Sequence, residues 1–214
     1  MEGETILFKR ILAIGAHRDD IEIGVGALLN KIIVENNFEF MGILHLSPPP
    51  DKGADNDEEA LNSAETLGIN PLDNRFRFHL HSFKAREFWS RRQEILDLLW
   101  SYRKYNPDTI LVHNTQDTHQ DHEIVNKETI RAFYDCSILG YESPSVIINS
   151  KNILYAKMND CNVQAKVDAL HTYETQLYRR GLNLDAIFSL ATLRGNQCGL
   201  GLAEAYEVIK IVLK

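Results

Sequence analysis

Residues 9–35 decide the fold, and they read KRILAIGAHRDDIEIGVGALLNKIIVE. The first part, 9–16, is short, rich in Ile, Leu and Ala, and has a glycine near its end, which is typical of a buried strand. Apolar residues then recur at helical spacing over 20–35, so a helix is expected there. Asp19 and Asp20 stand at its start, where acidic side chains complement the positive end of a helix. A buried strand followed at once by a helix is the basic unit of an α/β fold.

The same alternation continues along the chain. Apolar patterns predict further strands at 40–47, 75–83 and 109–114, further helices at about 58–67, 86–104, 121–134 and 162–178, and strand-like runs at 145–149 and 152–157. The apolar run 205–213 fits a strand or a helix, and residues 48–57, with three prolines, form the clearest loop. Strands that alternate with helices indicate a parallel sheet with helices on both faces. We therefore predict the α/β class and a single domain over residues 1–214.

The composition of the 214 residues excludes several classes of protein. Hydrophobic residues make up 44% and charged residues 25%, as in ordinary globular proteins. The net charge of −7 gives no support for a nucleic-acid partner, which requires clustered Lys and Arg. No apolar run reaches the ~18 residues of a membrane span, and the first residues lack the pattern of a secretory signal. Three widely spaced cysteines, Cys136, Cys161 and Cys198, fit reduced thiols, so a cytoplasmic location is expected.

Residues suited to catalysis gather in two short segments. The first is GAHRDDIE, 15–22, and the second is HNTQDTHQDH, 113–122. Both lie at the ends of predicted strands, and ligands of open α/β sheets bind at the carboxyl ends of the strands. Taken alone, the first segment is also typical of an acidic helix start, and His119 and His122 could be exposed surface residues. Together the segments place histidines beside four aspartates, which favours a metal site.

A divalent ion such as Zn²⁺ takes three protein ligands from His and carboxylate groups and leaves one position for water. His17 and Asp20, three residues apart at a tight turn, can converge on one ion, and His119 or His122 would complete the set. Asp19 would then act as general base, because a metal lowers the pKa of water toward ~7 and a nearby carboxylate takes the proton. The remaining histidine would stabilise an oxyanion or protonate a leaving group.

The two segments resemble the motifs of the LmbE/PIG-L family of metal-dependent N-deacetylases, Ala-His-Pro-Asp-Asp-x-Glu and His-x-Asp-His. They stand here as AHRDDIE, 16–22, and HQDH, 119–122. The similarity also includes NPDTILVHNTQDTHQDH, RAFYDCSILGYESP, KVDALHTYETQ and LRGNQCGLGLAEAYEVIK, so it covers essentially the whole chain. The resemblance implies a Rossmann-like, mostly parallel sheet, in agreement with the predicted alternation.

By position, the resemblance makes His17, Asp20 and His122 the metal ligands. It makes Asp19 the general base that activates water for attack on an amide carbonyl. His119 would stabilise the tetrahedral oxyanion or give a proton to the departing amine. The implied activity is that of a hydrolase acting on a linear amide C–N bond.

Other positions follow from the resemblance or depart from it. Asp121 would orient a metal-binding histidine, and Glu22 would form a structural ion pair. Arg86 is a substrate-binding candidate because REFWSRRQEIL resembles a stretch of some members, although an exposed arginine before a helix explains it equally well on sequence alone. Arg18 replaces the motif's proline, which is expected to loosen the turn and to bring a cation to the mouth of the site. Asn56 stands where many relatives carry an arginine near the substrate.

We therefore expect a metal-dependent hydrolase that removes an N-acetyl or other N-acyl group from an amino sugar or sugar conjugate. Zn²⁺ is the expected ion, and Fe²⁺ or Co²⁺ also suits two histidines and an aspartate. The substrate would be a small molecule, with nucleotide or lipid linkage left open. Family members often assemble into homo-oligomers, but the sequence does not fix the oligomeric state. The alternatives are an amidase for another N-acyl or thiol-sugar conjugate, and a non-catalytic sugar- or nucleotide-binding protein that keeps the metal site.

Overall fold

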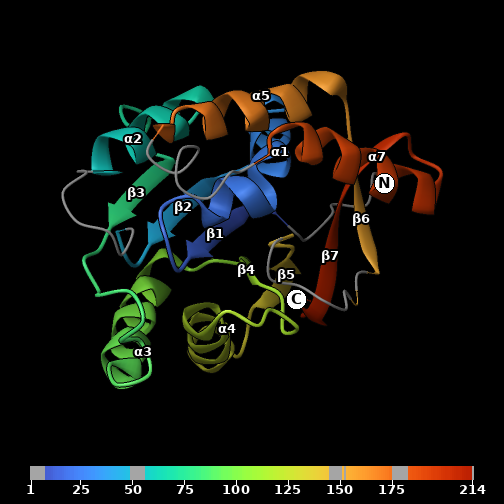
Figure 1. The fold of residues 1–214 in the computed structure, drawn as a ribbon. Coiled ribbons are helices and arrows are strands. Elements are labelled where there is room, and N and C mark those ends of the chain that lie inside the picture. Colours follow the sequence, from blue (N-terminus) through green and yellow to red (C-terminus); the bar gives the residue numbers. More distant parts are fainter. Residues whose placement is uncertain (1–7, 49–55, 145–150, 152, 175–182, 214) are drawn as a thin grey trace.

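A mixed seven-stranded sheet runs through the protein (Figure 1). The computed structural model describes residues 8–48, 56–144, 151, 153–174 and 183–213. The strand order is β3-β2-β1-β4-β5-β7-β6, in which β3 to β5 are parallel and β7 is antiparallel to both of its neighbours. The strands are β1 (Arg10–Gly15), β2 (Phe40–His45), β3 (Phe76–Leu80), β4 (Thr109–His113), β5 (Ser137–Tyr141), β6 (Leu154–Met158) and β7 (Leu202–Lys210).

Helices cover both faces of the sheet. They are α1 (Asp20–Val34), α2 (Asn56–Thr66), α3 (Arg92–Ser101), α4 (Gln120–Ala132), α5 (Asp160–His171) and α7 (Asp185–Cys198), with a short 3₁₀ helix, η1 (Tyr102–Tyr105). Figure 1 shows α1, α2, α5 and α7 on one face and α3 and α4 on the other. The predicted α/β class with a mostly parallel sheet is confirmed. No helix of the described residues is long and apolar enough to span a membrane.

The central strand β1 supplies side chains to both layers of the core. Ile11 and Ala13 pack with α1 on one face, and Leu12 and Ile14 pack with α3 and α4 on the other. This alternation follows from the two-residue period of a strand, and the burial on both faces explains why β1 is apolar from Ile11 to Ile14.

The order of the strands places two loops side by side. β2 and β3 lie on one side of β1, whereas β4 lies on its other side. The order of the strands therefore reverses between β1 and β4. At such a point the loops that follow the two strands open a crevice at the carboxyl edge. Here those loops are residues 16–19, between β1 and α1, and residues 114–119, between β4 and α4.

Several predicted elements differ from the structure. Strand β5 and helix α7 were not predicted, and the uncertain run 205–213 is mostly part of the antiparallel strand β7. The helix predicted at 86–104 begins only at Arg92, since Arg86 has a φ of 70°, outside the helical region, and residues 88–91 form turns. The helix predicted at 162–178 ends at His171; its last predicted residues and the run 145–149 lie outside the described part.

Candidate functional site

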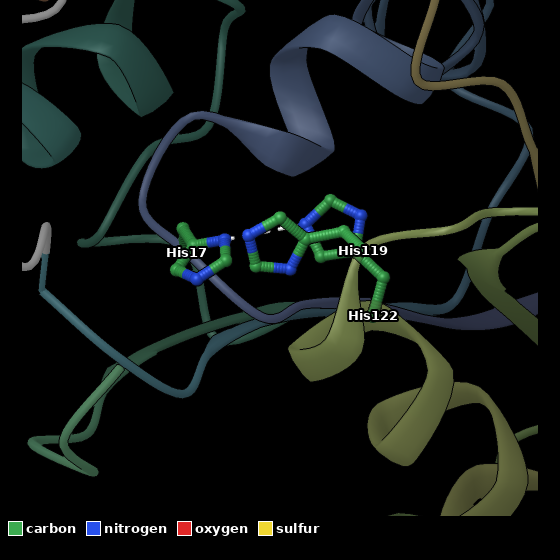
Figure 2. A group of neighbouring side chains, drawn as sticks. All are labelled: His17, His119 and His122. Carbon is green, nitrogen blue, oxygen red and sulfur yellow. Dashed lines mark hydrogen bonds between the residues drawn. The ribbon is translucent and has the colours of Figure 1, made fainter. Parts of the chain in front are cut away.

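The two loops at the carboxyl edge bring the predicted site residues together. Figure 2 shows His17, from the turn before α1, facing His119 and His122 from the start of α4. Their ring centroids are 4.9 Å apart for His17 and His119 and 5.2 Å apart for His17 and His122. Asp20 opens α1 with its carboxylate directed into the same space.

Three ligand atoms form a compact triangle in this space. His17 Nδ1 lies 3.2 Å from Asp20 Oδ2 and 3.2 Å from His122 Nε2, and the two latter atoms are 3.4 Å apart. Ligands about 2.1 Å from a tetrahedral ion lie roughly 3.4 Å from one another. The spacing and the chemistry of these donors therefore fit one divalent ion, and three donors leave the fourth position of a tetrahedral ion for another ligand.

Two neighbouring histidines offer further nitrogen atoms that could bind a metal ion. His119 forms a group with His17 and His122, and His113 forms a group with Asp20 and His122, with ligand atoms within 4.8 Å in each group. His122 belongs to both groups and to the triangle, so the site is centred on its ring.

A carboxylate orients each of the two imidazoles. Asp121 Oδ2 lies 3.2 Å from His17 Nε2, so the other nitrogen of that ring faces the centre. Asp117 Oδ2 lies 2.7 Å from His122 Nδ1 and has the same effect on His122. Histidines that bind metals commonly have such partners, which fix the tautomer and the orientation of the ring. The sequence indicated this role for Asp121 but gave no sign that Asp117 would share it.

The carboxylates make this centre favourable for cations. Burial lowers the pKa values of His17 and His122, but the charge of Asp20 and hydrogen bonds to carboxylates outweigh it, raising them to about 9 and about 10. Burial raises the pKa of Asp20, whereas the charges of the nearby imidazoles lower it well below the ordinary value. A pocket that stabilises positive charge on two imidazoles also suits a divalent cation held by the same atoms.

Asp19 is a buried carboxylate at the start of α1. Its residue is only 3% exposed, and its side chain makes no capping hydrogen bond to the helix. An acidic residue that serves only to begin a helix is normally exposed or bonded to the first turn. Simple helix capping therefore does not account for Asp19.

His119 is the N-cap residue of α4. Its Nδ1 accepts a hydrogen bond from the backbone N–H of Asp121 at 3.2 Å. Burial, together with the charges of His122 and His17, lowers the pKa of His119 to about 4. The ring is then neutral, with its proton on Nε2, and it offers that N–H as a hydrogen-bond donor.

Arg86 contributes to the site through its backbone. Its N–H donates to Asp121 Oδ2 at 2.8 Å, and the same oxygen faces His17. The side chain of Arg86 is exposed. Phe88, which is fully buried, lies 6.4 Å from the His17 ring, so the segment 86–88 holds the carboxylate and closes one wall of the site.

Two expectations about the first motif were wrong. Arg18 is only 1% exposed, and its guanidinium is bound to backbone and carboxylate oxygens, so it neither loosens the turn nor presents a cation at the mouth. Glu22 has no ion-pair partner among the described residues; its Oε1 lies 3.1 Å from both the Ser63 and the Tyr173 hydroxyl oxygens. Burial raises the pKa of Glu22 to about 8, so the group is a neutral acid at pH 7. Asn56 begins α2, and its side chain is not described.

His113 is a site residue to which the sequence gave no role, although it lies in the second segment. It is fully buried and stacks on His122 with centroids 3.7 Å apart. Its Nε2 accepts from the Ala16 N–H at 3.1 Å and lies 3.4 Å from Asp20 Oδ2. His113, the last residue of β4, thus contacts both the turn after β1, through the Ala16 N–H, and the ring of His122, through stacking.

The comparison with known proteins now identifies the family. Residues 12–133, more than half of the chain, match the model of the PIG-L family, described as GlcNAc-PI de-N-acetylase. The chain belongs to the PIG-L family. The resemblance seen in the two motifs is confirmed, and the protein is a hydrolase that acts on an amide C–N bond.

This protein is similar to a curated protein and to several solved structures. It is 26% identical over 177 residues to the uncharacterized deacetylase YaiS of Escherichia coli (strain K12), over 78% of this chain and 91% of YaiS. The conserved protein TT1542 from Thermus thermophilus has a TM-score of 0.78 and 20% identity over 97% of both chains. N,N'-diacetylchitobiose deacetylase from Pyrococcus horikoshii has a TM-score of 0.69 and 16% identity over 94% of this chain and 84% of that one.

The same fold also carries a different reaction. GalB, the 4-carboxy-2-hydroxymuconate hydratase from Pseudomonas putida KT2440, has a TM-score of 0.75 and 16% identity, and the match covers 97% of this chain and 98% of GalB. The fold alone therefore does not choose the chemistry, which has to be argued from the site and the family.

Proposed function

We propose that this PIG-L protein is a metal-dependent hydrolase that removes the N-acetyl group from an amino sugar or a sugar conjugate. The observation that carries the proposal is the triangle of His17 Nδ1, Asp20 Oδ2 and His122 Nε2, with sides of 3.2 to 3.4 Å. The family description and the diacetylchitobiose deacetylase both concern N-acetylated sugars, which supports this substrate class.

His17, Asp20 and His122 would hold the ion, for which Zn²⁺ is the first choice and Fe²⁺ or Co²⁺ the alternatives. When bound, such an ion supplies a Lewis acid that polarises the amide carbonyl and lowers the pKa of water. Asp121 and Asp117 keep the two imidazoles turned toward the centre.

The remaining residues carry the proton transfers. Asp19 takes a proton from the attacking water as the C–O bond forms and delivers it to the amine nitrogen as the C–N bond breaks. The neutral ring of His119 donates its Nε2–H to the oxyanion, consistent with its low pKa. The exposed side chain of Arg86 is a candidate for binding the substrate beyond the acetyl group.

The setting of the enzyme is part of the proposal. None of Cys136, Cys161 and Cys198 forms a disulfide within the described part of the chain, which fits a reducing cytoplasm.

Metal analysis and amine release test the function together. Protein purified without an affinity tag should contain about one zinc or iron ion per chain and release amine from some member of a panel of N-acetylated sugars. D19N should lower turnover by a factor on the order of 10² or more with its metal retained. D168N, at an exposed position of α5, is the matched control and should keep wild-type turnover.

Other outcomes would select the alternatives. Release only from substrates with another acyl group or a thiol-sugar would make the protein an amidase of that class. Metal binding with no release, and unchanged ligand binding in D19N, would indicate a binding protein. Protein that takes up no metal even on reconstitution would contradict the proposed hydrolase.

A further inference from the structure

Arg18 is a buried cation inside the turn that carries the site residues. It stands between His17 and Asp19, and it is only 1% exposed. Burying a charged side chain is costly unless the charge is compensated and its hydrogen-bonding groups are satisfied. The contacts of this guanidinium therefore show what it does in the turn.

Those contacts come from three separate elements. Arg18 Nη1 donates to the carbonyl oxygen of His45, the last residue of β2, at 3.3 Å. Nη2 donates to the carbonyl oxygen of His81, just after β3, at 2.9 Å. Nε donates to Asp57 Oδ1, in the first turn of α2, at 3.0 Å. A planar guanidinium spreads its N–H donors over three nitrogens in a rigid fork and so reaches acceptors that lie apart, whereas a lysine carries all of its donors on one nitrogen.

The backbone on both sides of Arg18 is also fixed. The His17 carbonyl oxygen accepts a hydrogen bond from His45 Nδ1 at 3.0 Å. The Arg18 carbonyl oxygen accepts one from the hydroxyl of Tyr173, a fully buried residue just after α5. The peptide groups before and after Arg18 are therefore anchored, in addition to its side chain.

We propose that Arg18 is a positioning residue that fixes the turn and thereby the direction of the Asp19 carboxylate; the catalytic part of this inference rests on the proposed function. The guanidinium joins the turn to the last residue of β2 and to the first residue after β3, which are themselves joined by a hydrogen bond from the His81 N–H to the His45 carbonyl oxygen at 2.8 Å. Asp57 compensates the charge, and because its side chain is 50% exposed it can be altered with little effect on the core. Arg18 itself does not touch the substrate, since its side chain does not reach the surface.

The kinetic test separates positioning from substrate binding. R18K keeps the positive charge but loses the planar guanidinium and its hydrogen bonds to the two carbonyl oxygens. Because the Asp19 carboxylate would then be misdirected, kcat should fall by about 10- to 100-fold, with little change in KM or metal content. D57N should lower kcat less, because the two carbonyl acceptors remain. A raised KM with unchanged kcat would instead place Arg18 in contact with substrate and overturn the inference.

R103A is the matched control. Arg103 also binds a carboxylate and a backbone carbonyl, Asp135 and Ala132, but it lies near the amino edge of the sheet. The R103A variant should leave kcat unchanged. Millimolar guanidinium ion should restore part of the kcat of R18A, by filling the space that the side chain leaves, and should have no such effect on R103A. If R18A and R18K lose only stability and retain kcat, Arg18 is merely structural.

Amide hydrogen exchange gives a readout that does not need activity. In R18A, the amides of residues 17–21 should exchange faster than in the wild type while those of β1 and β4 stay protected. Unchanged exchange in this turn would refute the positioning role. If wild-type protein binds metal but releases no amine from any sugar, the proposed function fails, and the exchange comparison still decides whether Arg18 holds the turn.

Discussion

At the scale of single residues, the site depends on one carboxylate for each imidazole. Asp117 Oδ2 accepts a hydrogen bond from His122 Nδ1 at 2.7 Å. We expect D117N to weaken metal binding by about 10- to 100-fold, because His122 loses the charged acceptor that fixes its tautomer and orientation. Metal titration of the folded variant measures this loss, with D97N on the exposed side of α3 as the control. An unchanged affinity in D117N would show that Asp117 does not support metal binding.

The same residues show what a sequence can predict at this scale. Both polar segments could be found because each follows a strand, and the carboxyl ends of parallel strands meet at one edge. The sequence could not show which of Asp117 and Asp121 orients which imidazole ring, because that pairing depends on how residues 114–119 lead into α4. The burial of Arg18 depends on carbonyl oxygens 27 and 63 residues away, which no local pattern reveals.

At the scale of elements, α1 lies against the sheet through a glycine. A Cβ atom at Gly24 would lie 2.2 Å from the ring of Tyr141, whose hydroxyl donates to the Ile14 carbonyl oxygen near the site. We expect G24A to lower the free energy of unfolding by about 1–3 kcal/mol, because the ring has to move. Urea denaturation measures the change. G26A is the control in the same helix: its Cβ would lie 3.1 Å from a Lys166 side-chain carbon, so a smaller loss is expected.

Equal losses in G24A and G26A would mean that the contact with Tyr141 has no special weight.

Elements were predictable where their pattern was long, as in α1, or regular, as in β1 and β4. β5 was missed because its sequence, SILGY, holds only two consecutive apolar residues, Ile138 and Leu139, before Gly140 interrupts the run. α7 was missed because only Ile187, Ala191 and Gly195 of its residues are buried, too sparse a stripe for a helical pattern to stand out.

At the scale of the whole molecule, acid stability depends on pairs that join distant elements. Hydrogen bonds from Arg103 lower the pKa of Asp135 from 3.8 to about 2. A depressed pKa stabilises the folded state above the ordinary value, and this contribution is lost as the pH falls from about 3.8 toward 2. The Asp135 side chain is 43% exposed, so we expect a contribution of about 1 kcal/mol or less.

D135N tests this contribution. The difference in unfolding free energy between wild type and D135N, measured by urea denaturation, should be constant near neutral pH and shrink below about pH 4. A difference that stays constant down to the lowest pH at which the protein is folded would contradict the lowered pKa.

Metal binding should also stabilise the whole fold, because the triangle draws its atoms from both sides of the crevice. An ion that binds only the folded state adds about 2.7 kcal/mol at roughly 100 times its Kd. We therefore expect Zn²⁺ to raise Tm and a chelator to reverse the rise. H122A should lose most of the rise, because His122 supplies an atom 3.2 Å from His17 Nδ1 and 3.4 Å from Asp20 Oδ2. H171A, at the exposed end of α5, should keep it. A full rise in H122A would mean that the ion is held elsewhere and that the triangle is not its site.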